Sequence, residues 1–162
     1  MKALVYTGVE ELIYRDEKDP VETSGESILK VHASGICGSD MHAYHGKDER
    51  RIAPLIIGHE VSGVIQNGKF QGKNAVLNPL ITCGKCEYCT SGREHLCPHR
   101  VLLGMNRPYE RQGVFAELVS SPNQNIYEVP DHLNLNEAAI AEPTAVALHA
   151  VLMLSLIHIS EP

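Results

Sequence analysis

The sequence Cys83-Gly84-Lys85-Cys86-Glu87-Tyr88-Cys89, followed by a fourth cysteine at Cys97, constrains how the middle of the chain folds. Residues 82–99 show no helical or strand periodicity, so burial of apolar side chains cannot hold this segment. The two-residue gaps let one tight loop bring three sulfur atoms to a common centre. Zinc binds four thiolates in a tetrahedron, with bonds of about 2.3 Å. We therefore predict a structural zinc site formed by Cys83, Cys86, Cys89 and Cys97.

The alternatives for these cysteines are disulfides, a redox C-x-x-C pair and an iron–sulfur cluster. Disulfides pair awkwardly when three of the cysteines lie within residues 83–89. A redox pair would lie near a βαβ unit, and the sequence predicts none here. A four-thiolate zinc site leaves no coordination position open for substrate, so this site is expected to hold the loop together.

Outside this loop the sequence predicts a domain that is mainly β with short helices. Apolar alternation or short apolar runs indicate strands at residues 2–6, 11–15, 27–33, 61–66, 74–77, 113–120 and 125–129. A short helix is expected to run as far as His45, and two more helices at residues 136–141 and 145–153, with Pro143 at the first position of the second. The charged run at residues 49–51 is interpreted as a solvated loop. The 13 Gly, 9 Pro and low aromatic content are typical of a turn-rich β domain.

Charge and composition exclude several classes of partner. The net charge is −6 and the basic residues are scattered, so no nucleic-acid partner is expected. The apolar stretch at residues 144–159 is interrupted by His149 and His158 and is shorter than the roughly 20 residues of a membrane span, so no membrane partner is expected either. The N-terminus does not resemble a signal peptide, which predicts a cytoplasmic protein. In a reducing compartment, five cysteines favour metal binding over disulfides.

A second set of metal-capable side chains is spread over three further motifs. Cys37 lies in G-I-C-G-S-D-M-H at residues 35–42, His59 and Glu60 lie in G-H-E-V-S-G at residues 58–63, and Glu142 lies in A-E-P at residues 141–143. Each motif falls at a turn beside a predicted strand or helix end. Taken singly, such residues are more often a small buried cysteine, a hydrogen-bonded histidine and a helix-start carboxylate. The residues alone therefore leave open whether they share a metal.

Taken together, the motifs resemble the zinc-dependent medium-chain alcohol dehydrogenase family. The resemblance covers residues 1–153 and includes G-V-F-A-E at residues 113–117, and the order and separation of all the motifs agree with the family. It implies a GroES-like, partly open β-barrel with a zinc-binding lobe, followed in the family by a Rossmann domain that binds NAD or NADP. The Glu-Pro pair at residues 142–143 is similar to the sorbitol, threonine and sugar-alcohol dehydrogenases.

The resemblance implies a catalytic zinc in addition to the structural one, and hence two Zn²⁺ per chain. Cys37 and His59 would be direct ligands. The remaining coordination, either direct or through water, would come from Glu60 and Glu142. Ser39 matches the family's hydroxyl at the substrate oxygen, and His42 matches a residue that passes the proton outward. The implied activity is NAD(P)-dependent oxidation of a secondary alcohol or polyol to a ketone.

The carboxyl end departs from the family pattern. No G-x-G-x-x-G dinucleotide fingerprint occurs, so we expect residues 1–153 to be a catalytic domain that is inactive without a cofactor domain. Residues 154–162 resemble translated sequencing-adapter DNA and are expected to be a non-native tail. The full-length form is expected to be a homo-oligomer acting on a small alcohol or polyol. The alternatives are a non-enzymatic zinc-binding GroES-like module and a zinc-independent reductase relative, and the intact metal motifs speak against both.

Overall fold

The computed structural model describes the backbone of residues 1–158 and the side chains of residues 1–154. This part of the chain forms three β-sheets. The largest sheet has five antiparallel strands in the order β10-β6-β5-β3-β9. Its strands are β3 (Glu26–Ser34), β5 (Val61–Ile65), β6 (Asn74–Leu77), β9 (Leu118–Pro122) and β10 (Ile126–Glu128). This sheet curls into half a barrel, which confirms the predicted GroES-like fold that is mainly β with short helices.

Two smaller sheets complete the β structure. One has the order β2-β1-β4, and the other pairs β7 with β8. Their bounds are β1 (Lys2–Gly8), β2 (Glu11–Asp16), β4 (Leu55–Ile56), β7 (Leu80–Ile81) and β8 (Val101–Leu102). The strands β4, β7 and β8 were not predicted, because two residues are too few to show any periodicity.

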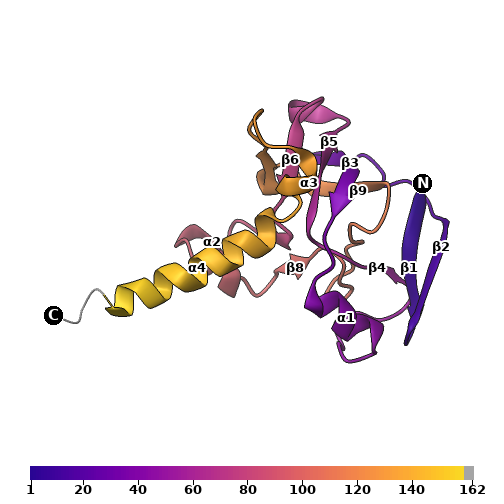
Figure 1. Cartoon of the computed structure of the whole chain (residues 1–162), viewed down its shortest axis with the longest axis horizontal. Helices are drawn as coiled ribbons and strands as arrows, with labels where there is room; N and C mark the ends of the chain where they lie inside the picture. Colours follow the sequence, from indigo (N-terminus) through magenta and orange to yellow (C-terminus); the bar gives the residue numbers. More distant parts are fainter. Residues whose placement is uncertain (159–162) are drawn as a thin grey trace.

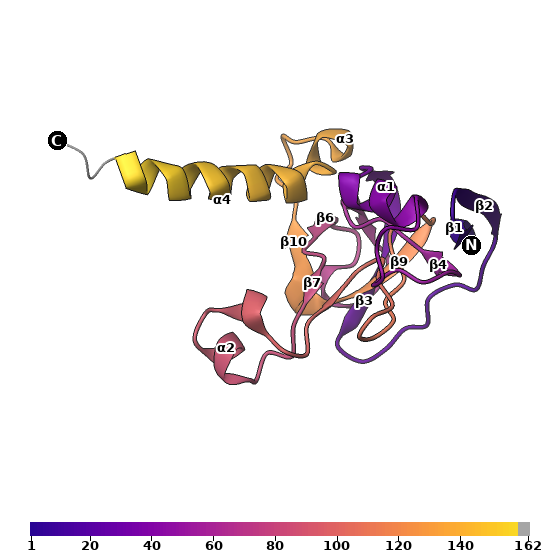
Figure 2. The ribbon, with the colours of Figure 1, turned by 90° about the horizontal axis from the view of Figure 1, so that it is seen from below.

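Helices α1 and α3 lie beside the sheets, whereas α2 is set apart from them and α4 projects away (Figures 1 and 2). The α-helices are α1 (Gly38–Tyr44), α2 (Glu87–Thr90), α3 (Leu135–Ala138) and α4 (Ala141–His158), and the 3₁₀ turns are η1 (Gly68–Phe70), η2 (Glu94–Leu96) and η3 (Asn123–Asn125). Helix α4 begins four residues earlier than predicted, so Pro143 is its third residue. Pro143 still lies in the first turn, where a missing N–H removes no intrahelical hydrogen bond.

The main core packs against the five-stranded sheet. Its buried side chains come from the strands and from the segments that cross the sheet, and they are Leu29, Val61, Ile65, Ala75, Leu77, Leu103, Val114, Val119 and Ile126. The predicted strand at residues 113–120 is regular only from Leu118. Its first part instead lies against the three-stranded sheet, because Gly113 donates to the Ile56 carbonyl of β4 over 2.7 Å and the Phe115 carbonyl accepts from Leu4 of β1 over 2.8 Å. The segment thus links that sheet to β9 of the five-stranded sheet.

One sequence prediction is wrong in this part of the chain. Arg51 was assigned to a solvated loop, yet only 3% of it is exposed. Its guanidinium is buried because it meets a carboxylate, Asp48, and main-chain carbonyls that replace its water. Its neighbour Arg50 is exposed, as predicted.

Helix α4 projects away from the sheets (Figures 1 and 2) and leaves large apolar side chains exposed as far as Leu154. No helix within residues 1–158 is both long enough and apolar enough to cross a membrane. The expectation of a non-native tail at residues 154–162 falls mostly on residues whose side chains lie outside the described part. It therefore stays a prediction, as does the domain boundary at residue 153.

Strand β5 depends on a glycine at its centre. Gly63 lies between Val31 of β3 and Ala75 of β6, and a Cβ there would overlap the Lys30 carbonyl oxygen. Because backbone cannot move aside cheaply, we expect Gly63→Ala to lower the free energy of unfolding by about 1–3 kcal/mol, as measured by denaturant titration. Gly8→Ala is the control, since a Cβ there meets only a side-chain atom at 3.8 Å. Equal stability of the two variants would contradict this account of the strand.

Candidate metal centres and catalytic site

The lobe of residues 83–97 brings its four cysteine sulfurs together. The Sγ of Cys83 lies 3.9 Å from that of Cys89 and 3.6 Å from that of Cys97, and Cys86 Sγ lies 3.5 Å from Cys89 Sγ. A tetrahedron with metal–sulfur bonds of about 2.3 Å has sulfurs about 3.8 Å apart, whereas a disulfide joins sulfurs at about 2.05 Å. All five cysteines of the chain are free. The geometry therefore fits a zinc ion, and it excludes disulfides.

The lobe builds this arrangement from short local elements. Cys86 is the N-cap of α2, Cys89 lies inside that helix, and Cys97 is the C-cap of η2. Figure 2 shows α2 and the lobe set apart from the sheets. Backbone N–H groups of Lys85 and Cys86 lower the pKa of Cys83 to about 6. The N–H of Cys89 acts the same way on Cys86, but burial and three neighbouring thiols raise the pKa of Cys86 to about 11. Of these two thiols, Cys83 therefore gives up its proton more readily, and the thiolate is the form that binds a metal.

A second metal-capable group gathers Cys37, His59 and Glu60, whose ligand atoms all lie within 4.8 Å of one another. His59 and Glu60 are buried, at 5% and 7% exposed, and Cys37 is half-buried. The chain brings them from two places: Cys37 precedes α1, and the other two precede β5. The residues alone left open whether these three share a site, and the family resemblance implied that they do; the structure places them side by side.

Cys37 is oriented by the start of α1. It is the N-cap residue, and its sulfur accepts a hydrogen bond from the Ser39 N–H at 3.5 Å. The carboxylate of Asp40 makes the reciprocal hydrogen bond, in which its Oδ2 accepts from the Cys37 N–H at 3.0 Å. This reciprocal capping box closes the first turn and fixes where the sulfur points.

Asp40 also faces His59 through its other oxygen. Asp40 Oδ1 lies 3.5 Å from His59 Nδ1, and both atoms are buried with no closer hydrogen-bond partner among the described residues. Burial alone would lower the pKa of His59, but the Asp40 carboxylate and Cys37 outweigh it and raise that pKa. Because Nδ1 faces Asp40, the other ring nitrogen is left for a metal. A carboxylate behind a ligating imidazole is the usual support for such a ligand, so these two unpaired atoms fit a metal at this site.

The Glu60 carboxylate can lie beside Cys37 and His59 because residue 35 is a glycine without a side chain. A Cβ on Gly35 would overlap the Glu60 Oε2 atom, and the Gly35 N–H donates to the Glu60 carbonyl at 3.1 Å. Sulfur, imidazole and carboxylate together form a mixed donor set that suits zinc. Among the residues that the structure describes, three protein groups meet here, in contrast to the four of the lobe. The site therefore has room for another ligand.

Glu142 stands outside this group in the structure. It is the second residue of α4 and is half-buried. Burial raises the pKa of its carboxyl, His59 opposes that shift and Glu60 adds to it. Glu142 therefore lies within electrostatic reach of both residues, although its oxygens do not join the three-residue cluster.

Ser39 and His42, the predicted proton-handling residues, line one cavity of 490 Å³. They lie three residues apart on α1 and so share a face of that helix. The other lining residues come from the following loop and are Lys47, Asp48, Glu49 and Arg50. The Ser39 main-chain N–H contacts the Cys37 sulfur, so this cavity adjoins the candidate metal group.

Sequence reasoning missed Asp40 and Arg51. Asp40 was quoted within a motif but was given no role. Its spacing of three residues from Cys37 matches a capping box and could have identified it as the partner of Cys37 at the start of α1. Nothing local marks Arg51, because its partners lie at Ser39, Asp48 and Gly104.

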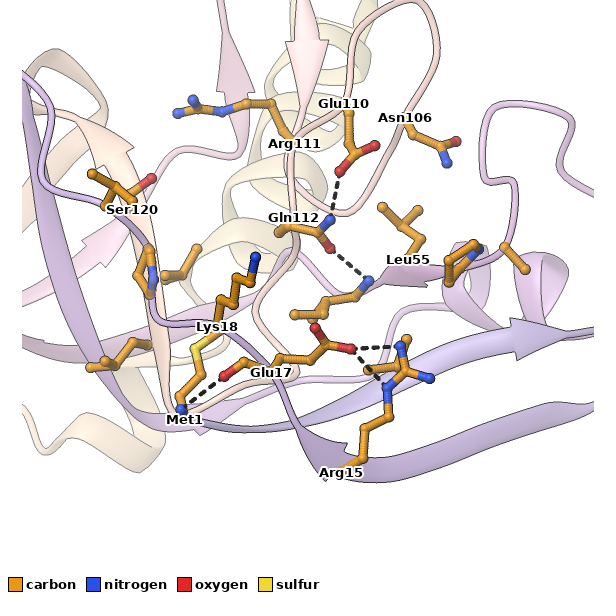
Figure 3. Close-up of a pocket in the computed structure, with 18 residues that line it drawn as sticks. Met1, Arg15, Glu17, Lys18, Leu55, Asn106, Glu110, Arg111, Gln112 and Ser120 are labelled. Atoms are coloured by element: carbon orange, nitrogen blue, oxygen red, sulfur yellow. Dashed lines mark hydrogen bonds and ion pairs between the residues drawn. The ribbon is translucent and has the colours of Figure 1, made fainter.

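A larger cavity than the one beside Ser39, of 740 Å³, lies elsewhere, between β1, β4 and β9. Figure 3 shows that several of its polar side chains bond one another: Arg15 pairs with Glu17, and Gln112 bonds both Glu110 and the Ile56 N–H. None of the predicted site residues lines it. The candidate chemistry therefore lies away from this cavity.

Comparison with known proteins agrees with this geometry. Residues 23–131 match the family model of the alcohol dehydrogenase GroES-like domain. The chain is 36% identical to an L-threonine 3-dehydrogenase of Anaeromyxobacter sp. (strain K), over 97% of this chain and 48% of that protein. It is 33% identical to a D-arabitol-phosphate dehydrogenase of Enterococcus avium, over 89% and 42% respectively.

Among solved structures, an alcohol dehydrogenase from Escherichia coli CFT073 complexed with NADH superposes with a TM-score of 0.82. Its sequence is 30% identical, and the match covers 91% of this chain and 44% of that one. The chain thus spans about half the length of the relatives that it matches. These relatives are dehydrogenases. With its fold, its motifs and more than half of its length matched, the chain belongs to the alcohol dehydrogenase GroES-like domain family.

Proposed function

We propose that this chain is the catalytic domain of a zinc-dependent dehydrogenase that oxidises a secondary alcohol or polyol with NAD or NADP. The observation that carries the proposal is the buried group of Cys37, His59 and Glu60, with Asp40 behind the imidazole. A module that acts only by binding other proteins has no need of a mixed-ligand site with room for a further ligand. The lobe of four cysteines would hold a second, structural zinc.

The proposed site assigns a task to each residue. Cys37 and His59 would hold the catalytic zinc directly, and Glu60 and Glu142 would supply the remaining coordination, either directly or through water. A bound zinc would act as a Lewis acid and lower the pKa of the substrate's hydroxyl group. Asp40 keeps His59 in the tautomer with the proton on Nδ1, so that the other nitrogen is free to bind.

The proton and the hydride leave the alcohol by separate routes. The Ser39 hydroxyl takes the proton from the substrate oxygen, since a hydroxyl can both accept and donate, and passes it on towards His42. His42 lies on the exposed side of α1 and can release the proton to water. A nicotinamide cofactor, when bound, would supply the oxidant: it would accept the hydride from the alcohol carbon, so that the alcohol is oxidised to a ketone as the dinucleotide is reduced.

The relatives guide the wider proposal. Threonine and arabitol phosphate, the substrates in their names, are both secondary alcohols, so we propose a small alcohol or polyol as substrate. The nicotinamide would be held by a cofactor domain outside residues 1–162, so this chain by itself is expected to show no turnover. The complete enzyme is proposed to be a homo-oligomer. A compartment that keeps thiols reduced, such as the cytoplasm, suits five free cysteines.

For the lobe, we expect Cys86→Ser to remove one of two zinc ions per chain and to lower the thermal midpoint markedly. Residues 83–97 have almost no apolar core, so the metal supplies most of their folding free energy. Metal content by mass spectrometry and thermal unfolding with and without a chelator measure both effects. An unchanged midpoint, or a chain that never held zinc, would rule out the structural site.

For the catalytic group, we expect Cys37→Ala to remove the other zinc and to leave the lobe's zinc in place. His32→Ala is the matched control, because His32 is exposed on β3 and should leave two zinc ions per chain. In an enzyme that carries a cofactor domain, Cys37→Ala should abolish alcohol-dependent reduction of the nicotinamide. One zinc per chain in the unaltered protein would instead favour the non-enzymatic module.

A further inference from the structure

Arg51 is a charged residue in the interior of the domain, with 0% of its side chain exposed. Its Nη1 donates to Asp48 Oδ2 at 2.6 Å and to the Ser39 carbonyl at 3.1 Å, and its Nε donates to the Gly104 carbonyl at 2.9 Å. Its Nη2 lies 3.4 Å from Ser39 Oγ and 3.8 Å from Asp40 Oδ1. An arginine in the protein interior must have its donors satisfied, and these contacts use every nitrogen.

These contacts join the two segments that carry the candidate zinc ligands. On one side is α1, whose first turn holds Cys37, Ser39 and Asp40. On the other side is Gly104, which has a φ of +73°. A Cβ on Gly104 would come within 2.9 Å of the Gly58 backbone, so this loop presses on the residue just before His59. Arg51 therefore connects the segment that carries Cys37 to the Gly104 loop, which packs against the segment that carries His59.

The guanidinium also restricts the Ser39 hydroxyl. Arginine has only donors, so Ser39 Oγ can only accept from it. The hydroxyl hydrogen must then point away from Arg51. In addition, Arg51 Nη2 lies 3.8 Å from Asp40 Oδ1, the carboxylate oxygen that faces His59. One side chain thus constrains the proposed proton acceptor and the carboxylate behind the proposed ligand.

We propose that Arg51 is a positioning residue for the catalytic zinc group. Its planar guanidinium holds Ser39 where its hydroxyl can reach the substrate oxygen, and it holds Asp40 where its carboxylate faces His59. This inference rests on the proposed function of the same site. Lysine cannot replace the guanidinium, because an ammonium group has one nitrogen and cannot span carbonyls and carboxylates that approach from several directions.

The test uses cobalt as the probe in place of zinc at the Cys37 group. The chain is prepared with zinc in the lobe, and the second site is titrated with Co²⁺ while the visible absorption of the cobalt–thiolate centre is recorded. Cys37→Ala gives the background. Arg51→Lys should weaken Co²⁺ binding about 10- to 100-fold and change the shape of the spectrum, as loss of support behind a metal ligand does. The lobe's zinc content should stay at one per chain.

Arg111→Lys is the matched control. Arg111 is also a partly buried arginine, at 25% side-chain exposure, paired with Glu26 at 2.9 Å, but it lines the larger cavity away from the metal group. It should lower stability without altering Co²⁺ affinity or the spectrum. Asp48→Asn provides a second variant if Arg51→Lys does not fold. Asp48→Asn removes the charge that pairs with Arg51 Nη1 but keeps the guanidinium. It should therefore weaken Co²⁺ binding roughly 10-fold, the lower end of the range expected for Arg51→Lys.

The outcomes separate this inference from the function on which it rests. If the unaltered chain binds Co²⁺ through Cys37 but Arg51→Lys binds it equally well with the same spectrum, Arg51 has no positioning role and the proposed function stands. An equal change in Arg111→Lys, or no change in Asp48→Asn when Arg51→Lys does not fold, overturns the inference in the same way. If the unaltered chain binds no cobalt through Cys37, both proposals fail.

Discussion

The carboxylate of Asp40 is the group on which the proposed catalytic site depends. It is 2% exposed, and its two oxygens serve different segments: Oδ2 closes the first turn of α1 on Cys37, and Oδ1 faces the His59 ring. A buried carboxylate is costly unless charge and hydrogen bonds offset its lost hydration. Arg51 supplies that charge, and Asp48 and Gly104 hold Arg51 in place. The positions of the candidate ligands therefore follow from a buried network of charges.

The two cysteine-containing groups are built on different principles. The lobe is local: four sulfurs within residues 83–97 converge through tight turns, far from the main core. The Cys37 group is assembled by tertiary structure, because the antiparallel pairing of β3 with β5 brings the end of one strand beside the start of the other. A metal in the lobe would stabilise a segment with little apolar burial. A metal in the second group would sit on a framework that the barrel core already holds.

Helix α4 leaves an apolar surface uncovered among the described residues. From residue 145 to residue 154 its side chains are exposed and, apart from His149, apolar, for example Val146, Leu148 and Val151. A helix of this composition is normally covered by other structure. Its first turn nevertheless contributes to the site, since the Glu142 carboxyl responds to the charges of His59 and Glu60. The helix thus links the metal group to a surface that the described residues leave uncovered.

The sequence by itself determined the β-rich class, most of the strands, the four-cysteine lobe and the family. These features are local or repeat with a short period: the lobe's spacing alone brings its sulfurs together, and strand alternation is visible within a few residues. Tertiary structure alone decided that Cys37, His59 and Glu60 meet while Glu142 stands aside, and that Arg51 is buried rather than solvated. Those outcomes depend on contacts such as Arg51 with Gly104, which join residues far apart in the chain and leave no local pattern.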